Sequence, residues 1–303
     1  MVYRLQGFMD LQSFFIQKIQ IFIDRMPSLS TTASKVLEVC NSPRTSANDL
    51  NRVISLDPVL TGNVLKLINS AYYSSYNQNS SLARAIIMLG LNTVKNLALS
   101  TAVIGAFGKK SSFTTLPMDA FWVHSIGVGV TAKAIATARN VLSTEREEYF
   151  VAGMLHDLGK IPLNTCFSEN YGQALQLAEL EQNSLLNAEQ LLVGVDHGVA
   201  GRLIGEKWHL GPVIIEAIAH HHAPEQAPDE HRDLVATVAL ANLYANINKI
   251  GSAGDPPPES AFLMRVLEIV GLKWDDLQPL QAIVNSEIDK AQVFLNLTER
   301  EMK

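Results

Sequence analysis

Residues 144–160 read TEREEYFVAGMLHDLGK, and this stretch decides the fold that we expect. Thr144 and Glu147 have the spacing of a capping box, which predicts the start of a helix, and Gly159 predicts its end. The apolar residues between these signals recur at the spacing of one helix face: Phe150, Val151, Met154 and Leu155. The stretch therefore predicts an amphipathic helix whose polar end carries His156 and Asp157.

This His-Asp pair is a candidate for metal binding. Neighbouring helical side chains point about 100° apart, so the imidazole and the carboxylate can hold one metal ion, or the carboxylate can bridge two. Nitrogen and oxygen ligands suit a divalent transition metal such as Fe, Mn, Zn or Ni. For a lone pair another interpretation stays open, namely a histidine that offsets the helix dipole beside a solvated aspartate.

All eight histidines of the chain lie between residues 124 and 231. Facing helices of an antiparallel bundle could bring several of them to Asp157, although spacing alone does not show that they converge. The candidate metal ligands are His124, His156, Asp157, His197, His221 and His222. We interpret His209 and His231 as surface or loop residues, and we expect His220 to be an ordinary histidine as well.

The same apolar periodicity extends along the chain and predicts an all-α fold. Predicted caps include the box of Ser46 and Asp49, Asp57 before a proline, Gly90 and Asn92. We expect helices near residues 14–23, 32–40, 46–55, 57–71, 82–89, 92–107, 116–139, 144–159, 168–181, 187–208, 212–222 and 234–250, and two more after residue 258.

Two polar segments, residues 109–115 and 251–258, predict the domain organisation. The second holds two glycines and three successive prolines, which is typical of a linker. We expect a helical first lobe of residues 10–108 packed on a helical bundle of residues 115–250, with a helical extension of residues 259–303.

The composition excludes several classes of protein. With 47% hydrophobic and 18% charged residues, the chain of 303 residues has material for a large core and is no disordered polyampholyte. The helices predicted near residues 46–73 could form a helix-turn-helix that binds nucleic acid. A net charge of −6 argues against this function. The distant Cys40 and Cys166 fit a reducing cytoplasm. We find no signal-peptide core and no apolar stretch that could span a bilayer, so we expect a cytoplasmic protein.

Beyond the His-Asp pair, several segments across residues 19–250 resemble the HDOD (HD-related output domain) family of bacterial signalling proteins. The segments that carry the resemblance are residues 26–29 (MPSL), 54–58 (ISLDP), 64–70 (VLKLINS), 85–90 (AIIMLG), 197–201 (HGVAG), 208–212 (WHLGP) and 217–222 (AIAHHH). The family is related to HD phosphohydrolases, which cleave phosphoesters on one or two metal ions. The resemblance implies an HD-like bundle in which the six candidate residues are metal ligands and Lys160 lies near a substrate phosphate.

Two departures qualify what the resemblance implies. Asn242 stands where the last aspartate ligand of the hydrolases would align, and no Gly-Tyr-Pro follows His222. An amide oxygen brings no negative charge to hold a second cation. We therefore expect a regulatory output module with a metal or ligand site that lacks catalytic competence, a signalling protein as partner and a nucleotide-like ligand. The alternative is a metal-dependent phosphohydrolase that acts on nucleotides or cyclic dinucleotides.

Overall fold

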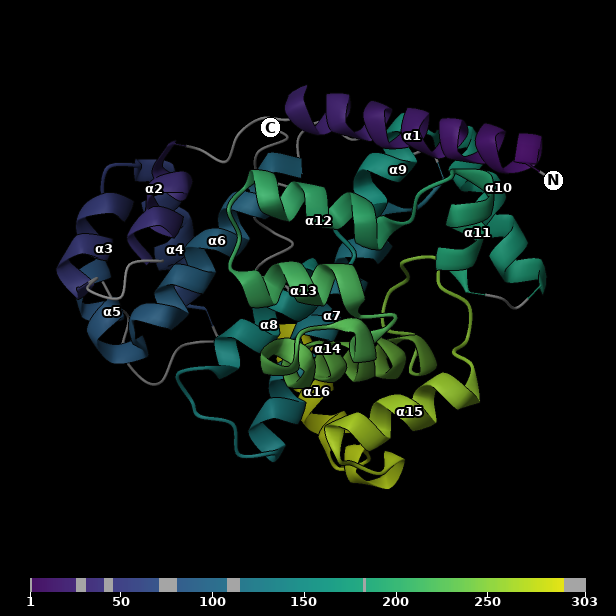
Figure 1. The fold of residues 1–303 in the computed structure, drawn as a ribbon. Coiled ribbons are helices and arrows are strands. Elements are labelled where there is room, and N and C mark those ends of the chain that lie inside the picture. Colours follow the sequence, from purple (N-terminus) through teal and green to yellow (C-terminus); the bar gives the residue numbers. More distant parts are fainter. Residues whose placement is uncertain are drawn as a thin grey trace.

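A computed structural model describes residues 2–25, 31–40, 46–70, 81–107, 115–181 and 184–291. Every regular element in these ranges is helical, which confirms the predicted all-α class. Figure 1 shows one group of helices at the side of the molecule and a larger group that forms its body. The first group is α2 (Thr31–Cys40), α3 (Ala47–Ile54), α4 (Pro58–Ile68), α5 (Leu82–Leu89) and α6 (Leu91–Phe107).

The larger group forms a helical bundle around α7, which packs against both α8 and α14. Helix α6 of the first group also packs on α8, so the two groups share this helix as a contact. The bundle consists of α7 (Met118–Ala138), α8 (Arg146–Leu155), α9 (Lys160–Cys166), α10 (Ser168–Glu181), α11 (Leu185–Leu192), α12 (His197–Lys207), α13 (Pro212–His220) and α14 (Asp229–Ile247).

Three further helices pack on this bundle. Helix α1 (Val2–Arg25) lies across α9 and α12, while α15 (Ser260–Val270) packs on α14 and α16 (Leu280–Ala291) packs on α7 (Figure 1). Short 3-10 turns cover Pro224–Gln226 and Trp274–Leu277. The three domain ranges stay predictions. Of the polar segment predicted at residues 109–115 only Thr115 is described, and the motif at residues 26–29 lies outside the described ranges.

A membrane crossing has little support in the described ranges. No single helix there has both the length and the hydrophobicity to cross a bilayer, and the sharply bent pair Leu82–Leu89 with Leu91–Thr101 passes only when its two parts are joined.

Most of the predicted caps in the first group are confirmed. Ser46 and Asp49 form the reciprocal capping box, and Asp57 accepts from two amides of the first turn of α4. Gly90 ends α5 with φ at 87°, a conformation that favours glycine. The predicted cap at Asn92 is wrong, because α6 begins one residue earlier and the Asn92 amide donates to a loop carbonyl instead.

The opening stretch forms its helix with different ends. The capping box of Thr144 and Glu147 is wrong, because Glu145 is the N-cap residue and the Glu147 carboxylate forms an ion pair with Lys133 on α7. The helix ends at Leu155 rather than Gly159, and residues 156–159 form a turn into α9. His156 and Asp157 therefore lie in the turn between two helices.

The single helix predicted over residues 187–208 is also wrong. Gly194 adopts a positive φ of 79°, which separates α11 from α12. The carboxylate of Asp196 then caps α12 by accepting from the Val199 amide at 2.9 Å. His197 is thus the first residue of a new helix, and its Nε2 atom lies 3.5 Å from Oδ1 of Asp157.

Candidate metal centre

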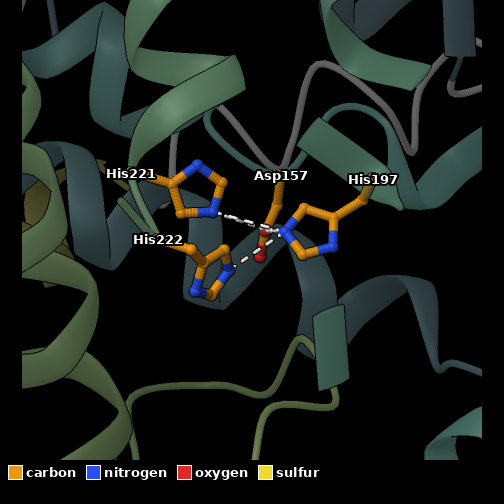
Figure 2. A group of neighbouring side chains, drawn as sticks. All are labelled: Asp157, His197, His221 and His222. Atoms are coloured by element: carbon orange, nitrogen blue, oxygen red, sulfur yellow. Dashed lines mark hydrogen bonds and ion pairs between the residues drawn. The ribbon is translucent and has the colours of Figure 1, made fainter. Parts of the chain in front are cut away.

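The structure brings all six candidate ligands together from separate parts of the bundle. His124 projects from the middle of α7, and His197 begins α12. The other four lie just beyond helix ends: His156 and Asp157 after α8, and His221 and His222 after α13. Figure 2 shows Asp157 and the rings of His197, His221 and His222 pointing toward one another. We refer to the six residues as the cage.

Close glycine contacts make this convergence sterically allowed. A Cβ atom on Gly153 of α8 would lie 2.9 Å from the Cα atom of Gly129 on α7. A Cβ atom on Gly159 would lie 1.8 Å from the carbonyl oxygen of His197. Because glycine has no side chain, α7, α8 and the start of α12 can approach one another closely at these two positions. Their ligands can then surround one carboxylate.

The Asp157 carboxylate lies at the centre of the cage and is fully buried. Its Oδ2 atom is 3.2 Å from Nε2 of His156 and 4.0 Å from Nε2 of His124. Its Oδ1 atom is 3.5 Å from Nε2 of His197 and 3.6 Å from Nε2 of His221. The two oxygens therefore face two different sets of imidazole nitrogens.

These contacts define two groups whose ligand atoms all lie within 4.8 Å of one another. The four-residue group is Asp157, His197, His221 and His222. The three-residue group is His124, His156 and Asp157. In the four-residue group, Nε2 of His197 is 3.3 Å from Nε2 of His221 and 3.0 Å from Nε2 of His222. Three imidazole nitrogens this close together favour coordination of a shared cation over direct contact with one another.

The hydrogen bonds on the far side of the rings fix which nitrogen faces inward. His156 Nδ1 lies 2.7 Å from the Gly153 carbonyl. His124 differs, because its Nδ1 lies 3.2 Å from the Ile250 carbonyl and its Nε2 lies 3.0 Å from the Asn242 side-chain oxygen, so its one N–H serves only one of them. His221 Nδ1 faces two carbonyls of α13, each at 3.1 Å. An Nδ1–H that donates outward leaves Nε2 with a free lone pair for a metal.

Two of the inward atoms lack a hydrogen bond. Among the described residues, Nε2 of His156 and Oδ1 of Asp157 are buried without a hydrogen-bond partner, whereas Oδ2 of Asp157 pairs with the Lys160 ammonium. Buried polar atoms of native proteins are nearly always satisfied. A metal ion satisfies such atoms, so the donor set fits one.

The protonation states agree with this chemistry. Burial lowers the pKa of His124 and of His221 to about 4, so both rings are neutral near pH 7. Burial alone would raise the pKa of Asp157, but His156 and Lys160 beside it hold that pKa well below its usual range. Neutral imidazole and ionised carboxylate are the forms that coordinate metals.

Two acidic residues that support the site were not predicted. Glu189 on α11 accepts from the His197 backbone amide at 2.9 Å and lies 2.6 Å from Nδ1 of the same ring. Burial would lower the pKa of His197, but the Glu189 charge raises it. Asp255 lies in the segment that joins α14 to α15, residues 248–259, which we call the strap. It forms an ion pair with Lys160 at 2.5 Å.

Lys160, expected near a substrate phosphate, is fully buried. Its ammonium lies 2.9 Å from Oδ2 of Asp157 and donates to the Ala253 carbonyl of the strap at 3.0 Å. Burial would lower the pKa of Lys160, but the charges of Asp157 and Asp255 raise it well above its ordinary value. The side chain is therefore a permanent cation held inside the protein.

Asn242, which the resemblance aligns with an aspartate ligand of the hydrolases, contacts the cage. Its side-chain oxygen lies 3.0 Å from Nε2 of His124 and accepts from Asn246 one turn along α14 at 3.1 Å. It lines a cavity of about 260 Å³ together with His222 and Asp255. This cavity gives one edge of the cage an approach from outside.

The remaining histidines lie outside the cage. His209 is exposed, with φ at 53°, after the end of α12. His220 lies 3.0 Å from a guanidinium nitrogen of Arg202 and 3.3 Å from Glu216. His231 was expected on the surface or in a loop, but it is half-buried in the first turn of α14, since that helix begins earlier than predicted.

Comparisons with known proteins agree with this architecture. The model of the HDOD domain matches residues 26–224. An uncharacterized protein of Treponema pallidum is 26% identical over 224 residues, which are 73% of this chain, and the match spans only 42% of that relative.

Solved structures extend the likeness over nearly the whole chain. An HDOD domain protein of unknown function from Geobacter sulfurreducens is 26% identical with a TM-score of 0.74, covering 94% of this chain and 98% of its own. A protein from Marinobacter aquaeolei, proposed to be a signal transduction protein, has the same fold at 17% identity with a TM-score of 0.69. Its match covers 96% of this chain and 66% of its own.

Proposed function

This chain belongs to the HDOD domain family, and we propose that it is a metal-binding regulatory module of signal transduction that does not hydrolyse phosphoesters. The observation that carries this proposal is the four-residue group. Asp157, His197, His221 and His222 offer four ligand atoms within 4.8 Å of one another. Three imidazoles and one carboxylate complete a four-coordinate set, as in metal sites that stabilise a fold.

The metal's expected role is to connect parts of the bundle. The four ligands come from the turn after α8, from the start of α12 and from the end of α13. A divalent ion such as Zn, Fe, Mn or Ni would hold these segments together, because the free energy of binding adds to that of folding. Glu189 would support this by orienting the ring of His197 through its Nδ1 atom.

Three features argue against phosphoester hydrolysis. Asn242 gives the cage a neutral amide where an acid would help to hold a second cation. The Lys160 ammonium is buried and paired with two carboxylates, so it is not free to contact a phosphate. The ring of His124 and the Asp157 carboxylate are completely buried, and His222 is the one cage residue that lines the cavity leading to the outside, so a substrate there would meet only an edge of the cage.

The partners follow from the proposed role. A signalling module passes its state to another protein, and the relative from Marinobacter aquaeolei carries a name of that kind. The cavity of about 260 Å³ beside His222, lined also by Arg265 and Phe262, is where we place a nucleotide-like ligand. A cationic and an aromatic side chain together suit a phosphate and a base.

Elemental analysis tests the metal-binding part of the proposal. The purified protein should contain a stoichiometric divalent metal, and its urea unfolding midpoint should fall after chelation. His221→Ala should lose the metal, whereas His209→Asn, in the exposed histidine outside the cage, should keep it. A wild-type protein that binds no metal at any tested concentration would refute this function.

A panel of nucleotides and cyclic dinucleotides tests the absence of hydrolysis. The second candidate function, a metal-dependent phosphohydrolase, is favoured by one observation: the two oxygens of Asp157 face separate groups of nitrogens. Two metal ions on one carboxylate could polarise a phosphoryl group. Turnover that is lost in both His156→Ala and His221→Ala would establish this alternative and exclude the first.

A further inference from the structure

The Lys160 ammonium occupies a particular side of the cage. It lies 2.9 Å from Oδ2 of Asp157, and Oδ2 is the oxygen that faces His124 and His156. The described contacts place no ammonium or guanidinium group on Oδ1, the oxygen that faces His197. The ammonium therefore contacts the same oxygen that would be a ligand of a metal ion bound by the three-residue group.

The strap holds the ammonium in this position. The Ala253 carbonyl accepts from Lys160 at 3.0 Å, and the Asp255 carboxylate pairs with it at 2.5 Å. The strap is itself tied to α7, because Ser252 donates to the Ala120 carbonyl at 3.0 Å. Since a buried ammonium must stay paired, Lys160 cannot leave Asp157 without also disturbing these contacts.

The charges around the cage match a single divalent ion. Among the described residues, the carboxylates next to the cage are those of Asp157, Glu189 and Asp255, and the ammonium is that of Lys160. These four groups leave two negative charges, which one divalent ion neutralises, and a second ion would place two further positive charges beside the ammonium. Buried charge without compensation is strongly unfavourable.

We infer that Lys160 is a built-in cation that takes the place of a second metal ion, so the cage holds one ion only, in the four-residue group. Asp255 positions Lys160 for this role. The inference rests on the proposed metal binding and adds the number of ions and the group that binds them. The role of Lys160 would also explain how this HD-type site binds one metal ion while it keeps every candidate histidine ligand.

Metal stoichiometry after gel filtration tests the inference with Mn²⁺ or Zn²⁺ as the probe. Wild-type protein should bind one ion per chain, and Lys160→Met should bind two, because Oδ2 and the charge of Asp255 become available. Adding His124→Ala to Lys160→Met should restore one ion. In the wild-type background His124→Ala should keep one ion, and His222→Ala should lose it. Lys290→Met, in a half-exposed lysine paired only with Glu287 among the described contacts, should still bind one.

If Lys160→Met fails to fold, a measurement on the wild-type protein alone still tests the inference. Electron paramagnetic resonance of the Mn²⁺-loaded protein should show the signal of isolated ions. Two ions per chain, or the spectrum of a coupled pair, would overturn the role of Lys160 but leave metal binding intact. A Lys160→Met variant that folds and still binds one ion would also overturn it. No bound metal would refute the proposed function instead.

Discussion

Gly159→Ala tests whether close helix packing builds the cage. Gly159 has φ −68° and ψ −18°, which alanine adopts without strain, so the substitution acts through packing alone. The added Cβ atom would lie 1.8 Å from the His197 carbonyl oxygen and 2.5 Å from the Gly201 amide nitrogen. Real Cβ atoms essentially never come closer than 3.0 Å, so α12 and the turn at residue 159 must separate by more than about 1 Å.

Such a movement is large on the scale of the site. His197 is the first residue of α12, and metal ligands tolerate only about 0.2 Å of displacement. We expect Gly159→Ala to lower the free energy of unfolding by about 3 kcal/mol, near the upper end for overpacking, because backbone atoms cannot rotate away. We also expect metal affinity to fall at least about tenfold.

Urea unfolding of the metal-free protein and chelator competition of the loaded protein measure the two effects. Gly62→Ala is the matched control, because Gly62 lies inside α4 and a Cβ atom there would meet nothing within 4 Å. It should raise the stability by about 0.5–1 kcal/mol through helix propensity. A Gly159→Ala variant with wild-type stability and metal affinity would refute our account of how α12 is placed.

Three other changes have defined outcomes. Glu189→Gln removes the charge that raises the pKa of His197, so chelator competition should show metal binding about 10–100-fold weaker. Acidification should destabilise the metal-free protein. His124 and His221 have pKa values of about 4 when folded, below the ordinary 6.5, so the unfolded chain takes up protons first. These two rings add no pH dependence above about pH 7, and their protonation should lower the stability in urea between about pH 6.5 and 4, by about 3 kcal/mol for each ring. Asp57→Ala removes the cap of α4 and should cost about 1 kcal/mol in the same urea assay.

Each of these outcomes can fail separately. Unchanged metal affinity in Glu189→Gln would mean that packing alone orients His197. A metal-free protein whose stability rises toward pH 4 would show that the buried rings are not neutral. Wild-type stability in Asp57→Ala would mean that solvent replaces the cap of α4 at no cost.

The sequence predicted those parts of the fold that depend on local interactions. Ser46 and Asp57 cap their helices through amides within three residues, and the structure contains both caps. Glu147 has equally good local spacing, but a lysine from another helix takes its carboxylate. The break at Gly194 went unpredicted because the apolar pattern continues through it, although glycine was a visible signal.

The site shows the same limit. Residue type and family resemblance identified the six candidate ligands, and the fold places them together. Glu189 and Asp255 could not be identified in this way, because neither has a motif, Glu189 acts across a break between two helices, and Asp255 acts on a lysine 95 residues away. An acid eight residues before His197 carries no signal until Gly194 turns the chain back on itself.

The distribution of the cage along the chain has a consequence for biosynthesis. The ligands span residues 124–222, and the strap that holds Lys160 follows them. A growing chain emerges from the ribosome N-terminus first, so the four-residue group cannot form before His222 has emerged. Metal capture must then come late, after most of the bundle has been synthesised. The ion that the mature protein carries would reflect the metals available at that moment, which makes expression conditions part of any measurement of metal identity.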